Sequence, residues 1–180
     1  MLNTRDRATF ADPADLVLAV FDDAVEQARA AMLTACGKSD TWVDAVRAAL
    51  CALLAFFDRD PNRARFLVVS SFSGGSSMRA RRVRLLRELA DALEAGRPGP
   101  PAASADPPFG TDAVVAAAAA ILHARLLEEP VPPLSPLSPS LMAWIVLPYL
   151  GVGAARGELA RETSPTSDSQ VRAAGAGAVL

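Results

Sequence analysis

Apolar residues recur every three or four positions along most of this 180-residue chain, which is the spacing that places side chains on one face of an α-helix. No stretch alternates between apolar and polar residues with the period of two expected for a half-buried strand. The predicted helices cover about residues 13–35, 40–58, 61–71, 77–95, 111–128 and 138–161. The pattern therefore predicts an all-α fold, a six-helix, bundle-like domain.

Short signals mark the ends of these helices. Asp12-Pro13, Asp60-Pro61 and Ser138-Pro139 each combine an N-cap residue with proline at the first helical position. Ser39 or Asp40 is expected to open the second helix and Thr111 to cap the fifth. Together these signals predict one domain over residues 12–163, with a short junction at 1–11 and a disordered tail at 164–180.

Composition and charge narrow the class of protein. Hydrophobic residues make up 51% of the chain, charged residues make up 21%, and the net charge is −2. This is typical of a globular domain with a sizeable core, and it provides no strong field toward nucleic acid or an anionic membrane. The polar N-terminus has no apolar segment typical of a signal peptide. We therefore expect a cytoplasmic protein.

One uncharged stretch, residues 130–155, invites comparison with a membrane helix. It contains six prolines, and its apolar part, residues 141–155, is shorter than the ~20 residues that a membrane-spanning helix needs. The stretch therefore favours a buried or interface helix, and no membrane contact is expected. A membrane-associated protein stays the less favoured alternative.

The segment FADPADLVLAVFDDAVE, residues 10–26, resembles the junction between the helix-turn-helix and the ligand domain of TetR/AcrR-type transcriptional regulators. Phe10, Asp12, Asp15 and Leu16 fit the end of that junction motif. Two later segments resemble further motifs of the same family in the same order. The matching residues are Asp58, Asp60, Pro61, Ala64, Arg65, Phe66 and Val68, followed by Ile145 or Leu147, Pro148, Tyr149, Leu150, Gly151 and Ala155.

The resemblance implies a ligand-sensing and dimerisation domain, in which effector binding favours one dimer geometry and so releases DNA. The helix-turn-helix of the family needs about three helices, and only nine residues precede Phe10. We therefore expect the chain to lack the DNA-reading head, either as a truncated regulator or as a headless partner. Such a chain would form a homodimer or a heterodimer with a full-length paralogue, and DNA would be a partner only if the head were restored upstream.

The family's effector pocket lies among the middle helices, so the resemblance implies a small apolar or aromatic effector there. Ligand pockets are mostly apolar with a few polar anchors, and Ser70, Ser71 and His123 are the available anchors. Ordinary core packing is the competing interpretation for the aromatic and thiol side chains. The candidate ligand-binding residues are Cys51, Phe56, Phe66, Ser70, Phe72 and His123.

The last two predicted helices combine small residues with a large apolar face. A face of that size indicates a partner surface, and the family pairs these helices with their copies in a self-complementary interface. Burial within the monomer is the competing interpretation. The candidate dimer-interface residues are Leu122, Leu126, Leu141, Trp144, Ile145, Pro148, Tyr149, Gly151 and Ala155.

No residue pattern predicts catalysis, a metal site or a cofactor. His123 is the only histidine and cannot form a metal site alone. Cys36 and Cys51 are interpreted as reduced core thiols. Five arginines between residues 79 and 87 lie beside acidic residues, which favours a solvated helix face over a nucleic-acid surface. The sequence favours a sensor rather than an enzyme, with a helical-bundle enzyme or small-molecule carrier as the alternative.

Overall fold

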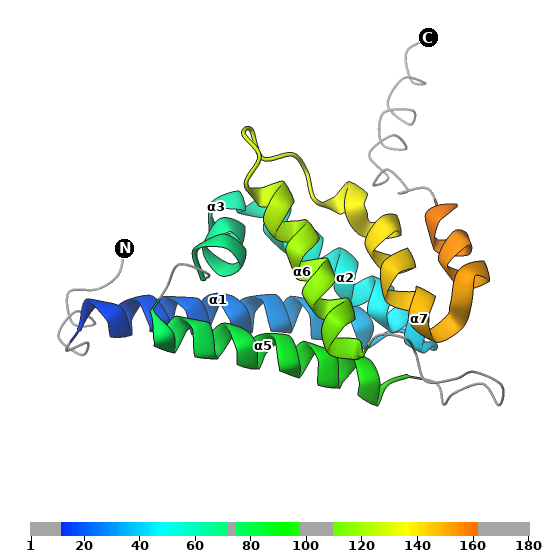
Figure 1. Ribbon diagram of the computed structural model, residues 1–180, viewed down its shortest axis with the longest axis horizontal. Coiled ribbons are helices and arrows are strands. Elements are labelled where there is room, and N and C mark those ends of the chain that lie inside the picture. The colour runs from blue at the N-terminus through cyan, green and yellow to red at the C-terminus, as the bar shows by residue number, and fades with distance from the viewer. Residues whose placement is uncertain (1–11, 72–74, 98–109, 162–180) are drawn as a thin grey trace, which may run out of the picture.

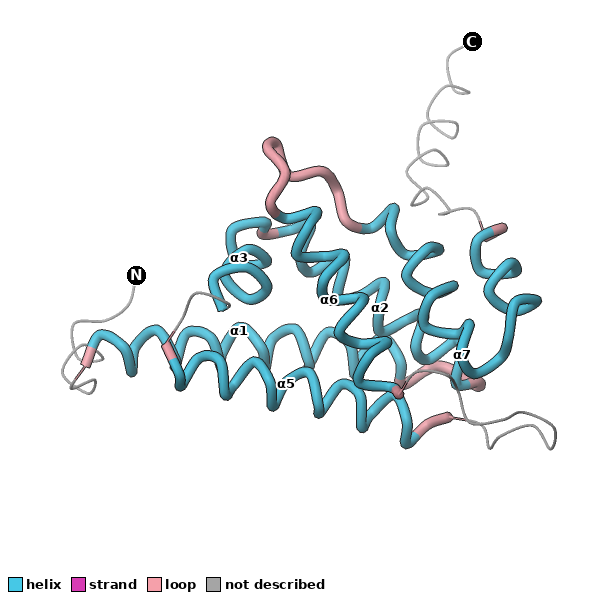
Figure 2. Tube along the Cα trace, in the orientation of Figure 1, coloured by secondary structure: helices cyan, strands magenta, loops and turns pink. Residues whose placement is uncertain are grey.

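The computed structural model describes residues 12–71, 75–97 and 110–161 and forms α-helices without strands in these ranges (Figures 1 and 2). The six α-helices are α1 (Pro13–Cys36), α2 (Trp42–Arg59), α3 (Pro61–Arg65), α5 (Ser76–Ala95), α6 (Thr111–Leu126) and α7 (Ser138–Leu159). A π-helical turn, η2 (Phe66–Ser70), continues α3, and a 3-10 turn, η3 (Ser135–Leu137), precedes α7. The predicted all-α, six-helix class is confirmed. The predicted junction at 1–11 and tail at 164–180 lie outside the described residues.

Helices α1 and α5 run side by side in the same direction, with α2 against α1 and α6 against α5, and α7 packs on α2 and α6 (Figure 1). Two ion pairs, Asp22–Arg81 and Arg29–Glu88, join α1 to α5. The core forms where α1, α2, α6 and α7 meet, because these helices turn their largest apolar side chains toward one another. The most deeply buried of these are Phe21, Leu54, Leu126, Leu141, Met142 and Val146, joined by Leu134 from the connection between α6 and α7.

The cap-then-proline signals account for two of the three helix starts predicted from them. The Asp12 carboxylate accepts a hydrogen bond from the Ala14 N–H at 2.9 Å, and Asp60 accepts one from the Arg63 N–H at 3.0 Å. These side chains satisfy N–H groups that have no partner within the first turn of a helix. The α2 cap is Thr41, a residue or two later than predicted.

The other two predicted caps are wrong. Gly110 and Leu137 occupy the N-cap positions of α6 and α7 without a side-chain hydrogen bond, so Thr111 and Ser138 are the first helical residues. Thr111 instead accepts a hydrogen bond from the Tyr149 hydroxyl at 3.0 Å. The Ser138 Oγ lies 3.1 Å from the Cys51 Sγ. Both hydroxyls therefore connect helices rather than capping them.

Trp42, the first residue of α2, contacts both the end of α5 and the middle of α7. Its Nε1–H donates to the Leu93 carbonyl of α5 at 3.0 Å, and its ring meets Tyr149 of α7 edge-on at 5.6 Å. Gly96 makes room for this ring, because a Cβ there would lie 3.0 Å from the Trp42 Cδ1. The end of α5 is thus attached to α7 through an aromatic contact.

Asp58 and Arg65 fix the connection between α6 and α7. The Arg65 Nε donates to the Leu126 carbonyl at 2.8 Å, which satisfies an oxygen at the end of α6. The Asp58 carboxylate accepts hydrogen bonds from the backbone N–H groups of Leu134 at 2.6 Å and Ser135 at 3.0 Å. Both residues belong to the segment that resembles the TetR/AcrR motif, and in this chain they have a structural role.

Helix α7 bends sharply, so the predicted single last helix is corrected to two arms. Gly151 has φ 78° and breaks the helical geometry shortly after Pro148, and the second arm turns back along the first (Figure 1). The bend brings Glu158, which is 6% exposed, against α2. There the Arg47 guanidinium donates two hydrogen bonds to its carboxylate, at 3.0 and 2.7 Å. This contact raises the pKa of Arg47 above its usual value.

Candidate ligand cavity

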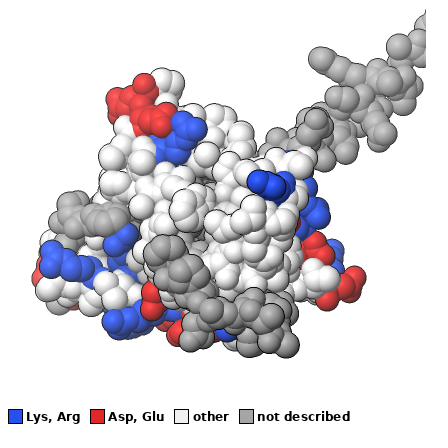
Figure 3. Space-filling model, turned by 45° about the vertical axis from the view of Figure 1, so that its right-hand side comes forward, with Lys and Arg blue, Asp and Glu red and all other residues white. Residues whose placement is uncertain are grey.

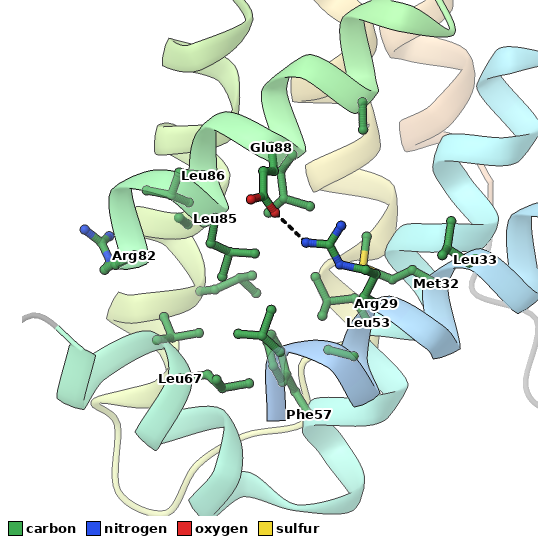
Figure 4. Close-up of a pocket in the computed structure, with 17 residues that line it drawn as sticks. Arg29, Met32, Leu33, Leu53, Phe57, Leu67, Arg82, Leu85, Leu86 and Glu88 are labelled. Atoms are coloured by element: carbon green, nitrogen blue, oxygen red, sulfur yellow. Dashed lines mark hydrogen bonds and ion pairs between the residues drawn. The ribbon is translucent and has the colours of Figure 1, made fainter. Parts of the chain in front are cut away.

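A cavity of about 240 Å³ lies between α1 and α5 and is closed by α2, η2 and α6 (Figure 4). Most of its lining is aliphatic, so it is suited to an apolar molecule. The lining residues are Val25, Ala28, Arg29, Met32 and Leu33 of α1, Leu53 and Phe57 of α2, Leu67 and Val68 of η2, Arg82, Leu85, Leu86, Glu88, Leu89 and Ala92 of α5, and Ala119 and Leu122 of α6.

The cavity exists because the helices around it present small side chains where larger ones would fill the space. Ala28 and Ala119 face it from α1 and α6. Leu85 and Leu86 of α5 border it and are only half-buried. Phe57, which is 5% exposed, forms part of the opposite wall. Covering partly exposed apolar side chains with an apolar molecule removes them from water, which lowers the free energy and favours binding.

Three charged side chains belong to the lining: Arg29, Arg82 and Glu88. An ion pair joins Arg29 to Glu88 across the space between α1 and α5, as the dashed line in Figure 4 marks. These two side chains are 45% and 42% exposed, so the pair faces solvent. Arg29 also lies 3.7 Å from Glu26. Partial burial lowers the pKa of Arg82 from its usual value.

A second ion pair, Asp22–Arg81, joins the same two helices about two turns nearer their N-terminal ends. Both of its side chains are also partly exposed, and neither lines the cavity. Exposed ion pairs contribute little to stability because water solvates both partners well when they separate. The ion pairs that join α1 to α5 can therefore break and be replaced by contacts with water or with another charged group at little cost in free energy.

The predicted ligand-binding residues that the structure describes lie outside this cavity. Phe66 packs edge-on against Phe21, with 6.2 Å between the ring centroids, and Phe56 lies beside Phe57 at 6.0 Å. Their sequence neighbours, Leu67 and Phe57, line the cavity instead. Adjacent residues on a helix point about 100° apart, so an error of one position moves a side chain out of the site.

The polar candidates are also placed elsewhere. Cys51 and Ser70 are exposed, and His123 is half-buried on α6 without bordering the cavity. The core-thiol interpretation of Cys51 is therefore wrong, while Cys36 is half-buried. Phe72 lies outside the described residues. The assignment of these residues to a ligand site stays a prediction that the cavity does not support.

The sequence did contain a signal for the residues that line the cavity. Leu50, Leu53 and Phe57 are three and four residues apart, and this spacing places them on one face of the second predicted helix. Arg29 and Glu88 left no such signal, because a charged residue near the edge of an apolar face is typical of any helix surface.

The structure divides the predicted dimer-interface residues into two groups. Six are buried within the chain: Leu122, Leu126, Leu141, Ile145, Tyr149 and Ala155. Trp144 is 53% exposed, Gly151 is exposed and Pro148 is half-buried. Leu147, at 38% exposed, lies near Trp144 on the same helix. Of the predicted interface residues that the structure describes, those left exposed therefore lie on the outer side of α7, and Figure 3 shows a broad uncharged surface on this side of the molecule.

The arginine-rich part of α5 faces solvent, as predicted. Arg79, Arg84 and Arg87 are exposed and border a shallow depression together with Val83. Arg81 pairs with Asp22. These side chains form a solvated helix face on the outside of the cavity wall.

Two further observations limit the chemistry of the described residues. No group of three or more His, Cys, Asp or Glu side chains in these ranges could hold a metal ion. Residues Ser135–Leu159 are long and apolar enough to cross a membrane by length and composition alone. This segment bends at Gly151 and carries the buried Glu158.

Comparisons with protein-family models, with curated proteins and with solved structures find no match. The resemblance to TetR/AcrR-type regulators thus rests on the sequence segments quoted above.

Proposed function

We propose that this chain is a cytoplasmic ligand-sensing domain of the kind found in TetR/AcrR-type transcriptional regulators. It binds a small apolar molecule between α1 and α5 and pairs with a second chain through α7. The observation that carries this proposal is the aliphatic cavity of about 240 Å³. The titratable groups in its lining are Arg29, Arg82 and Glu88. They provide no nucleophile and base of the kind that enzymes combine, so we favour binding over turnover.

The volume of the cavity indicates the size of the apolar group that it can enclose. An apolar cavity of ~150 Å³ holds benzene, so a cavity of about 240 Å³ suits a molecule of two fused rings or a similar branched aliphatic. Drug-sized pockets are typically larger, at ~300–1,000 Å³. A larger effector would need α5 to move outward.

A connection between α5 and α7 supports a sensing role. The Trp42 indole donates to the Leu93 carbonyl near the end of α5, and the Arg97 guanidinium lies over the Tyr149 ring at 5.4 Å. A ligand that shifts α5 would therefore change the contacts of α7. Such a ligand selects one of two arrangements only if it binds one of them more tightly.

The exposed side of α7 supports pairing. Trp144 and Leu147 are exposed apolar side chains three residues apart on this helix. Exposed apolar patches of this kind mark interaction sites, and a second copy would present the same side chains. We expect light scattering across a concentration series to give about twice the 18.8 kDa chain mass. A monomer at every concentration would contradict the pairing.

The cavity can be tested with 2-naphthol, a neutral two-ring probe, by titration calorimetry. Ala119→Leu places a larger side chain in the cavity from α6. Ala116→Leu adds the same group at an exposed position on the same helix and serves as the control. We expect Ala119→Leu to weaken binding at least tenfold and Ala116→Leu to leave it unchanged. No binding to the unmodified chain, or equal effects of the two variants, would refute the proposal.

A further inference from the structure

The charged side chains of the cavity indicate the chemical class of its ligand. We propose that the ligand combines an apolar body of about two rings with one carboxylate, and that this carboxylate binds Arg29 in place of Glu88. This inference rests on the ligand-binding function proposed above. It assigns Arg29 as the polar anchor of a site whose other contacts are mainly apolar.

Charge complementarity favours an anion. Of the charged residues that line the cavity, Arg29 and Arg82 are basic and Glu88 is acidic. A cationic ligand would be repelled by two guanidinium groups and attracted by one carboxylate, whereas an anionic ligand would be attracted by two groups and repelled by one.

Position favours Arg29 over Arg82 as the anchor. In Figure 4 the Arg29 side chain extends from α1 toward Glu88 on α5, whereas the Arg82 guanidinium points away from this pair. A guanidinium presents several N–H groups in one plane and can bind a carboxylate through two parallel hydrogen bonds. Arg29 therefore offers a ligand carboxylate the interaction that it now makes with Glu88.

The ligand carboxylate has an advantage over the Glu88 carboxylate because it is attached to an apolar body that shields the new ion pair from water. The Arg29–Glu88 pair is almost half exposed, so water weakens it. A ligand whose apolar body fills the cavity excludes water from one side of the new pair. Hydrogen bonds between charged groups become stronger where water is excluded.

The exchange also releases a contact between helices. Arg29–Glu88 and Asp22–Arg81 both join α1 to α5. Binding of the ligand carboxylate would leave Glu88 unpaired with α1 while Asp22–Arg81 persists. Arg29 would thus couple ligand binding to the release of one of the contacts that hold α5 against α1.

The test compares 2-naphthoate with its neutral analogue 2-naphthamide by titration calorimetry at low salt, in the full chain and in three variants. We expect 2-naphthoate to bind at least tenfold more tightly than 2-naphthamide. Arg29→Gln should abolish this preference and leave 2-naphthamide binding unchanged. Glu88→Gln removes the competing carboxylate and should strengthen 2-naphthoate binding about threefold to tenfold. Asp22→Asn makes the same charge change outside the lining and should alter neither affinity.

The outcomes separate this inference from the proposed function. If both probes bind equally and Ala119→Leu weakens both, the cavity binds ligands but the carboxylate assignment is refuted. If Arg29→Gln keeps the preference for 2-naphthoate, Arg29 is not the anchor. Tighter binding of 2-naphthylmethylammonium, lost in Glu88→Gln, would replace the anion with a cation. If none of the probes binds, the proposed function and this inference both fail.

Discussion

Helices α5 and α7 have similar lengths but very different places in the molecule. Nine of the 22 residues of α7 are buried, whereas two of the 20 residues of α5 are, Met78 and Ala90. Helix α7 fills the core, and α5 covers a cavity. The difference indicates which part of the fold is fixed and which part is held weakly enough to respond to a ligand.

The polar contacts of the two helices differ in the same way. Glu158 of α7 is buried against Arg47 and receives two hydrogen bonds from it. Glu88 and Arg81 of α5 pair with α1 at the surface, where each partner remains partly exposed. A desolvated charge without its partner is costly, while an exposed one returns to water. Breaking the contacts of α7 should therefore cost more than breaking those of α5.

Truncating one side chain on each helix should give the largest difference. Met142→Ala removes a side chain that is 1% exposed in the core, and we expect it to lower the free energy of unfolding by about 2–5 kcal/mol. Leu89→Ala, on the half-buried wall of the cavity, should cost about 1 kcal/mol because fewer contacts are lost. Urea denaturation measures both. Equal losses would mean that α5 is as firmly packed as α7.

The two acidic residues should give a smaller difference. Glu158→Ala leaves the half-buried Arg47 with only Asp44 as an ion-pair partner, so we expect a loss of about 1.5–3 kcal/mol. Glu88→Ala should cost less than about 1 kcal/mol. At 1 M salt the screening length falls to ~3 Å, so the effect of Glu88→Ala should nearly vanish while that of Glu158→Ala persists. The reverse salt dependence would contradict the contrast drawn between the two helices.

Helix number and most helix ends could be predicted because their causes are local. Side-chain spacing predicts the helices, and Asp12 and Asp60 cap α1 and α3 through bonds to residues two or three positions away. Thr111 and Ser138 misled the prediction because their hydroxyls bind groups on distant helices. The sequence around a possible cap residue does not reveal whether its side chain will form a hydrogen bond with a distant helix instead.

The site and the interface could be predicted less well because they depend on how helices are rotated against one another. An apolar face has the same pattern whether it meets another helix, a ligand or a second chain. Tyr149 and Trp144 were both assigned to the interface, yet the structure buries Tyr149 against Trp42 and exposes Trp144. The pairing of Arg29 with Glu88 joins residues far apart in the sequence, which no local pattern encodes.

The bend of α7 provides the smallest and most specific test, since two nearby glycines should respond with opposite signs. A Cβ at Gly151 or at Gly153 would meet no atom within 4 Å, so space does not distinguish them. Gly151 alone of the two has a positive φ, 78°, which combines with a ψ of −178° that essentially only glycine adopts, so an alanine there costs about 1–3 kcal/mol. Gly151→Ala should therefore destabilise the chain by that amount. Gly153→Ala should stabilise it by about 0.5–1 kcal/mol, because alanine favours the helix.

If Gly151→Ala instead stabilises the chain, α7 can continue as a straight helix. Its second arm would then leave α2, and Glu158 would lose Arg47, so Glu158→Ala in that background would cost little. The part of α7 after residue 151 would then be held as weakly as α5, and the firm core would end at the first arm. The opposite signs of the two glycine variants therefore decide how far along α7 the contrast with α5 extends.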